Sequence, residues 1–171
     1  MSMARMYPDH LDEQVQSQAE RTLYTALGKQ LDESYVVFHH VGWVAHDKRK
    51  HPKDGEADFV IAHADRGVLV IEVKGGTIRR DGKTGHWTTT GVSGITDPIP
   101  DPIEQAKDSK CVLLDRLKLA LARSIVIGHA IAFPDIEVQS TFLGLDLPRQ
   151  ILLDVTDVPQ LARWVEQALA Y

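Results

Sequence analysis

The sequence is poor in cysteine, with Cys111 alone among 171 residues. A lone cysteine cannot form a disulfide within the chain, and it excludes the zinc sites that are built from several thiolates. No apolar run reaches the roughly 20 residues of a membrane-spanning helix, and the N-terminal stretch MSMARMYPDH lacks the hydrophobic region of a secretory signal. We therefore expect a cytoplasmic protein with no membrane partner, in which any metal ion is held by oxygen or imidazole ligands.

Net positive charge is also lacking, because the formal charge at neutral pH is −5. This charge argues against a protein that coats nucleic acid through bulk positive potential, although a local basic cluster can still contact phosphates. Such a cluster is more often a solvated loop than a phosphate-contacting arm, and the sequence favours the loop without excluding the arm. The basic residues concerned are Lys48, Arg49, Lys50, Lys53, Arg79, Arg80 and Lys83.

No internal repeat and no low-complexity tract divides the chain, so we expect one domain over residues 1–171. Apolar residues recur every three or four positions from Leu11 to Leu31, which predicts a helix with one buried stripe. Asp101 as N-cap, Pro102 in the first turn and Glu104 three residues after the cap predict the start of a second helix that runs to about Leu121. A third helix is predicted over residues 158–170.

The predicted strands alternate with these helices. Residues 56–63 and 68–74 are separated by a link short enough for an antiparallel hairpin, and residues 86–90 are expected to extend that meander. The apolar run of residues 124–133 is typical of a central strand that is covered on both faces. Residues 35–41 and 151–153 are further predicted strands, and residues 46–55 are predicted to be a polar loop. The fold class is therefore α/β, with a central mixed β-sheet that contains an antiparallel meander and is flanked by helices.

The stretch GVLVIEVKGG, residues 67–76, places two charges in a strand that otherwise suits a protein core. Side chains alternate across a strand, so Glu72 and Lys74 share one face, and the predicted hairpin brings Glu56 or Asp58 beside Glu72. Taking such carboxylates out of water is costly unless an opposite charge compensates them. Mg²⁺ provides this compensation with oxygen ligands, and the combination of carboxylates, metal and ammonium suits phosphodiester hydrolysis.

The order of four motifs resembles a known family. These motifs are Glu20 in the N-terminal helix, Asp58 in GEADFV, Glu72-Val73-Lys74 in VLVIEVKGG, and Gln105 in DPIEQA. Together they resemble the nuclease-related domain, NERD, of the PD-(D/E)xK nuclease superfamily, from ARMYP near the start of the chain to IAFP at residue 134. The resemblance implies a restriction-endonuclease-like αβββαβ core.

The resemblance also implies roles for individual residues. Asp58 and Glu72 would be metal ligands for Mg²⁺ or Mn²⁺, Lys74 would be the catalytic lysine, and Glu20 would complete or support the metal site. Gln105 would be a polar residue of the following helix that faces the site. Glu56 belongs to the motif, but the resemblance assigns it no clear role.

The implied function is metal-dependent hydrolysis of DNA, with RNA as a possible substrate, in DNA processing or repair. The opening ARMYP resembles the helicase-associated subgroup, so the chain is expected to be the N-terminal domain of a longer helicase-containing protein. Two alternatives stay open: a nucleic-acid-binding module that cleaves weakly and positions a helicase, and a protein-interaction domain with a vestigial site. The scattered histidines show no helical H-x-x-x-H pair and predict no zinc site; they are His39, His40, His46, His51 and His63.

Overall fold

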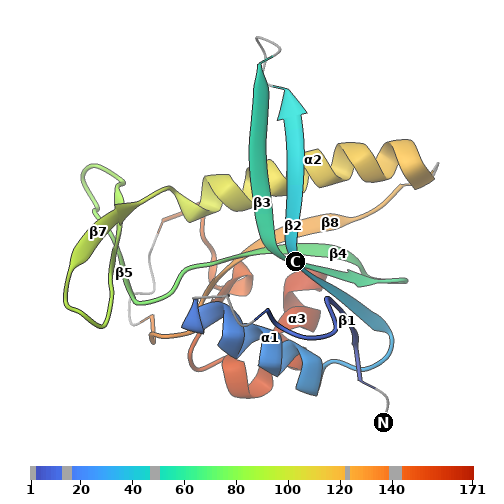
Figure 1. The fold of residues 1–171 in the computed structure, drawn as a ribbon, viewed down its shortest axis with the longest axis horizontal. Coiled ribbons are helices and arrows are strands. Elements are labelled where there is room, and N and C mark those ends of the chain that lie inside the picture. The colour runs from blue at the N-terminus through green and yellow to red at the C-terminus, as the bar shows by residue number, and fades with distance from the viewer. Residues whose placement is uncertain (1–2, 13–16, 47–50, 122–123, 139–143) are drawn as a thin grey trace.

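A six-stranded mixed sheet forms the centre of the protein (Figure 1). The computed structural model describes residues 3–12, 17–46, 51–121, 124–138 and 144–171. The strand order is β1-β2-β3-β4-β8-β9, in which β2, β3 and β4 are antiparallel neighbours and the remaining pairs are parallel. The strands are β1 (Arg5–Tyr7), β2 (Tyr35–His46), β3 (Pro52–His63), β4 (Gly67–Val73), β8 (Ile127–Phe133) and β9 (Leu152–Asp154). The predicted fold class, a mixed sheet with an antiparallel meander, is confirmed.

Helices cover both faces of this sheet. Helices α1 (Gln18–Gln30) and α3 (Leu161–Ala170) lie on one face, and α2 (Pro102–Leu121) crosses the other (Figure 1). Side chains such as Phe59 and Ile71 point into the main core with α1 and α3, whereas Val60 and Val70 form a smaller cluster with α2. Burial on both faces explains why β4 reads as a continuous apolar run. The order α1-β2-β3-β4-α2-β8 is the expected αβββαβ core.

Both long helices begin at side-chain caps. The hydroxyl of Ser17 accepts a hydrogen bond from the amide of Glu20 (3.2 Å), so α1 starts later than the predicted Leu11, and residues 13–16 lie outside the described part of the chain. The predicted cap of α2 is confirmed, because Asp101 Oδ1 accepts the amide of Ile103 at 2.8 Å. Burial along α2 is confined to its first half: Ile103 and Ala106 are buried, whereas Leu121 at the end of the helix is 44% exposed.

A second, three-stranded sheet is inserted between β4 and α2. It consists of β5 (Thr77–Arg80), β6 (Trp87–Thr90) and β7 (Thr96–Ile99). The prediction that residues 86–90 extend the meander is therefore wrong. The chain leaves the main sheet at Gly76, whose φ of 81° is a conformation that side chains with a Cβ rarely adopt.

Strands β2 and β3 extend beyond the main sheet as a two-stranded arm (Figure 1). Their pairing continues to His46 and Pro52, so the ends of the predicted polar loop are strand, and residues 47–50 lie outside the described residues. The arm rests on α2 through Ser109, whose hydroxyl accepts the Trp43 indole N–H (2.9 Å) and donates to the Glu56 carbonyl (3.2 Å). These bonds fix the base of the arm on α2.

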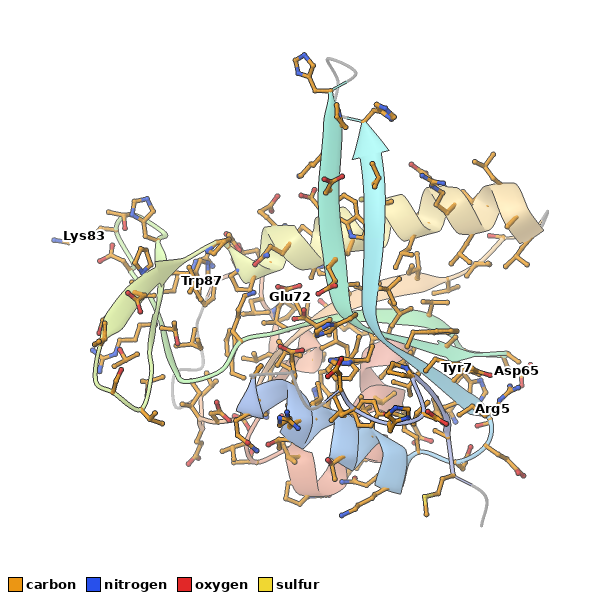
Figure 2. The ribbon with its side chains drawn as sticks, in the orientation of Figure 1. Arg5, Tyr7, Asp65, Glu72, Lys83 and Trp87 are labelled. Atoms are coloured by element: carbon orange, nitrogen blue, oxygen red, sulfur yellow. The ribbon has the colours of Figure 1, made fainter. Side chains whose placement is uncertain are left out.

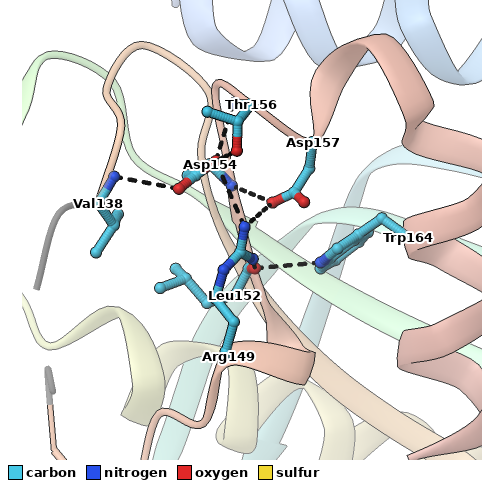
Figure 3. Close-up of polar contacts among 7 residues, drawn as sticks. All are labelled: Val138, Arg149, Leu152, Asp154, Thr156, Asp157 and Trp164. Atoms are coloured by element: carbon cyan, nitrogen blue, oxygen red, sulfur yellow. Dashed lines mark hydrogen bonds and ion pairs between the residues drawn. The ribbon is translucent and has the colours of Figure 1, made fainter. Parts of the chain in front are cut away.

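A polar network around Asp154 joins β9 to the chain that leads into α3 (Figure 3). The Asp154 carboxylate accepts hydrogen bonds from the amide of Val138 (3.1 Å) and from the amide and hydroxyl of Thr156 (2.9 and 2.5 Å). Arg149 bridges to Asp157 at 2.8 Å. Asp154 is 3% exposed, yet its hydrogen bonds replace those lost to water.

Among the described residues, no helix combines the length and apolar character needed to cross a membrane.

Candidate active site

Strands β3 and β4 separate where the sequence places its acids. Their ladder ends at the pair Phe59 and Ile71, so Asp58 and Glu72 occupy the next positions on the two strands. The side chain of Asp58, not a strand carbonyl, accepts the amide N–H of Val73 at 2.7 Å. Beyond this point β4 continues alongside β8, while β3 runs out with β2 into the arm. Because no β3–β4 pairing continues past Phe59 and Ile71, the carboxylates of Asp58 and Glu72 lie where the two strands separate, at the base of the arm.

Glu72 and Lys74 form the ion pair that their spacing suggests. Lys74 Nζ donates to Glu72 Oε1 at 2.6 Å, and the Glu72 side chain is only 4% exposed. Figure 2 shows Glu72 at the foot of the arm, between the second sheet, marked by Trp87, and the far end of the main sheet, marked by Asp65. Lys74 is 20% exposed, so its ammonium lies between the buried carboxylate and solvent.

The pKa values of the two strand acids are both raised. Burial raises the pKa of Glu72 to about 7, and the neighbouring charge of Asp58 adds to the effect, although Lys74 opposes it. Burial likewise raises the pKa of Asp58 to about 6 against the opposing influence of the Val73 amide and Lys74. The charge of Glu20 raises the pKa of both groups further. One lysine is therefore too little positive charge for this cluster of acids.

A comparison with Asp154 shows why this burial is unusual. Asp154 and Glu72 are each 3% exposed. Burial would raise the pKa of Asp154, but hydrogen bonds from Thr156 and Val138 hold it below the ordinary value. Glu72 lacks such a set of donors among the described residues, and its pKa rises. Asp154 is a satisfied structural acid, whereas Glu72 is kept in an unfavourable environment, which is typical of functional sites.

Glu20 on α1 faces the same region but contacts two histidines. Its Oε2 lies 3.0 Å from His39 Nε2 and 2.6 Å from His40 Nε2. Burial alone would raise the pKa of Glu20, but these two hydrogen bonds bring it down to about 2. Burial would lower the pKa of His40, yet its contact with Glu20 and the charge of Glu56 raise it overall. Glu20 is thus an ionised carboxylate bound to imidazoles.

The histidine pair is the feature that sequence reasoning missed. Consecutive strand residues normally point to opposite faces, so strand alternation does not predict that His39 and His40 both contact one carboxylate. His40 has a φ of 56°, which breaks the alternation and turns both rings toward Glu20. The ligand atoms of Glu20, His39 and His40 all lie within 4.8 Å of one another. The one available signal was the doubled histidine at the position in β2 that faces Asp58.

The remaining predicted site residues are less closely engaged. Glu56 is 47% exposed at its side chain and reaches His40 Nδ1 at 3.9 Å. Gln105 lies in the first turn of α2, and its Oε1 is buried without a hydrogen-bond partner among the described residues. No described hydrogen bond joins Gln105 to Asp58 or Glu72. Its expected orientation toward the site stays a prediction.

Two of the basic residues have structural partners. Arg80 forms a two-pronged ion pair with Asp146 (2.7 and 2.9 Å) and lies 5.1 Å from the ring centre of Trp87. Lys53 pairs with Asp108 of α2. Residues 48–50 lie outside the described part of the chain. The expectation of a phosphate-contacting cluster is therefore not supported at Arg80 and stays a prediction elsewhere.

Comparison with known proteins identifies one family. The model of the nuclease-related domain, NERD, matches residues 16–134. The matched region contains every predicted site residue, from Glu20 to Gln105. No curated protein and no solved structure is similar enough to the chain to count as a match.

Proposed function

Because the chain belongs to the nuclease-related domain family, we propose that it hydrolyses DNA phosphodiester bonds with the help of Mg²⁺ or Mn²⁺. The observation that carries this proposal is the pair of buried acids at the point where β3 and β4 separate, with pKa values of about 6 and about 7, beside a single lysine. Two buried carboxylates that are ionised without a neighbouring metal ion destabilise the folded protein, and a hard divalent ion offsets this free-energy cost directly.

The donor set fits such an ion. Asp58 and Glu72 offer carboxylate oxygens, which are the ligands that Mg²⁺ and Mn²⁺ prefer. Asp58 uses Oδ2 to accept the Val73 amide, and Glu72 uses Oε1 to accept from Lys74, so each carboxylate has a second oxygen for a cation. Glu20 supports the site at longer range, because its negative charge favours cation binding.

The chemistry proposed for the bound ion is Lewis-acid activation of the attacking water and stabilisation of the charge that grows on the phosphate. In the reaction, the water oxygen loses a proton to solvent and forms a bond to phosphorus, while the bond from phosphorus to the leaving ester oxygen breaks and that oxygen takes a proton from solvent. Lys74 is held 2.6 Å from Glu72, and its remaining ammonium hydrogens can donate to the water or to a phosphate oxygen. Asp58 keeps its position through the Val73 amide, which fixes the carboxylate against the strand end.

The wider setting is also proposed. We infer that the protein acts in the cytoplasm in DNA processing or repair and that it accompanies a helicase, as the ARMYP opening suggests. RNA remains an alternative substrate, since the proposed site acts on the phosphodiester group, which DNA and RNA share.

The direct test is nicking of supercoiled plasmid by the purified protein at pH 8 with Mg²⁺ or Mn²⁺. We expect nicking that EDTA abolishes and that falls by at least about 100-fold in Asp58→Asn and in Lys74→Met. The matched control Asp115→Asn makes the same chemical change on the exposed side of α2 and should cut normally.

The result against hydrolysis would be a protein that binds plasmid but gives no metal-dependent product with either ion. In that case the domain is a nucleic-acid-binding module that positions an attached helicase. Binding of a labelled oligonucleotide, measured in the same buffers, separates this outcome from a protein that does not engage DNA at all.

A further inference from the structure

Two imidazoles and a carboxylate converge beside the strand acids, and their geometry matches a metal site of a different kind. Glu20 Oε2 lies 3.0 Å from His39 Nε2 and 2.6 Å from His40 Nε2. In the tetrahedral geometry of Zn²⁺ sites, metal–ligand bonds of about 2.0–2.2 Å place neighbouring ligand atoms roughly 3.3–3.6 Å apart. The ligand atoms of all three side chains lie within 4.8 Å of one another, so limited side-chain adjustment would let them surround an ion.

The two histidines are held in place for this arrangement. The ring of His39 lies 4.7 Å from that of Phe59 and 5.7 Å from that of Tyr24, and His39 is 7% exposed. The His40 ring lies 3.9 Å from the His39 ring. Packing on several sides fixes the His39 ring, so little side-chain entropy remains to be lost when a metal binds.

The second nitrogen of His40 faces a carboxylate. His40 Nδ1 lies 3.9 Å from Glu56 Oε1, close enough for a short shift to form a hydrogen bond. Metal-bound histidines generally donate their other ring N–H to a carboxylate or carbonyl, which sets the tautomer that leaves Nε2 free to bind. This contact gives a role to Glu56, which neither the resemblance nor the mechanism above assigns.

The left-handed conformation of His40 is a second sign of a built site. A φ of 56° is uncommon for a residue other than glycine and is costly within a strand. In return it places the Nε2 atoms of adjacent residues on one carboxylate oxygen, which regular alternation would prevent. Strain of this kind persists where the surrounding structure enforces it, and it is concentrated at functional sites.

We propose that Glu20, His39 and His40 form a transition-metal site that binds Zn²⁺ in preference to Mg²⁺. Two imidazole nitrogens and one carboxylate are a common ligand set for Zn²⁺ sites with open positions, whereas Mg²⁺ requires mainly oxygen ligands. His40 is 42% exposed at its side chain, so the remaining coordination positions face solvent. This proposal rests on the ligand geometry and does not depend on the proposed hydrolysis of DNA.

The test titrates the whole protein with Zn²⁺ by calorimetry and with Co²⁺ as a spectroscopic substitute. We expect binding of one equivalent of Zn²⁺ and a visible Co²⁺ absorption band that Zn²⁺ removes by competition. His40→Gln and Glu20→Gln should each weaken Zn²⁺ binding at least about tenfold and lose the Co²⁺ band. His86→Gln removes an exposed histidine in the turn before β6 and should leave both signals unchanged.

Asp58→Asn distinguishes the two metal sites. It should keep the Co²⁺ band and lose the rise in melting temperature that Mg²⁺ produces in the unmodified protein. The proposal is overturned if His40→Gln and Glu20→Gln bind Zn²⁺ as the unmodified protein does, or if Asp58→Asn alone abolishes the Co²⁺ band. Absence of plasmid nicking, with the His40-dependent band still present, would refute the hydrolysis and leave this site in place.

Discussion

Replacement of Glu72 by glutamine should stabilise the metal-free protein at pH 8. The folded state raises the pKa of Glu72 from 4.5 to about 7, a difference of about 2.5 units, and one unit corresponds to about 1.4 kcal/mol. Because this pKa is raised on folding, its contribution to stability is complete below pH 4.5 and is lost as the pH rises through about 7. At pH 8 the charged Glu72 therefore costs about 3 kcal/mol that a neutral amide avoids.

We expect Glu72→Gln to gain about 2 to 3 kcal/mol in the free energy of unfolding in EDTA at pH 8, since Lys74 keeps an oxygen acceptor. For a chain of this size the melting temperature should rise by about 5 to 10 °C. Urea unfolding followed by circular dichroism measures the gain, which should shrink below about 1 kcal/mol at pH 5. The same change at exposed Glu33 should alter stability by less than about 0.5 kcal/mol.

A variant that is less stable than the unmodified protein at pH 8, or equally stable, would refute this reasoning. It would mean that Glu72 is compensated in the folded state without a metal ion. A gain that persists unchanged at pH 5 would point instead to better packing of the amide, because the charge of Glu72 is largely absent there.

Further predictions concern the same acids and their surroundings. The rise in melting temperature caused by Mg²⁺ should decrease as the pH falls below about 7, because protons compete for Glu72 and Asp58, whose pKa values are about 7 and about 6; calorimetric scans from pH 5 to 8 measure it. Asp154→Asn should lower the free energy of unfolding by about 1 to 3 kcal/mol in urea titrations, because the network of Figure 3 loses a charged acceptor, and it should leave the Mg²⁺ response intact. Gly76→Ala should cost about 1 to 3 kcal/mol in the same titrations, since φ is 81° and an added Cβ would lie 2.7 Å from the carbonyl oxygen of Thr90. An unchanged urea midpoint in either variant would contradict the structural role given to that residue.

The core of the fold was predictable because each of its elements carries a local signal. The run from residue 67 to Ile71 is apolar on both faces, and the short link before it allows only a tight antiparallel connection to β3. The cap at Asp101 marks the start of α2 by side-chain chemistry alone. The extended run at residues 86–90 was predicted, but its place in a separate sheet was not, because the chain leaves the main sheet through the positive φ of Gly76, which a strand pattern does not reveal.

In the candidate site, too, some residues carry a sequence signal and others do not. Strand alternation places Glu72 and Lys74 on one face, and the hairpin brings Glu56 or Asp58 beside them; the resemblance to the nuclease-related domain then selects Asp58, which the structure places next to the amide of Val73. The contact of Glu20 with His39 and His40 depends on one left-handed residue within a strand. Strand periodicity cannot anticipate such a conformation, since it assumes that neighbouring side chains point to opposite faces.

The most direct test of the account is a crystal structure of the protein with Mn²⁺, with anomalous data collected on both sides of the manganese absorption edge. The account predicts an anomalous peak bound by one oxygen of Asp58 and one of Glu72, at about 2.0–2.3 Å from each. The contradictory result is a structure in which Glu72 contacts only the ammonium of Lys74 and no manganese lies between the carboxylates of Asp58 and Glu72.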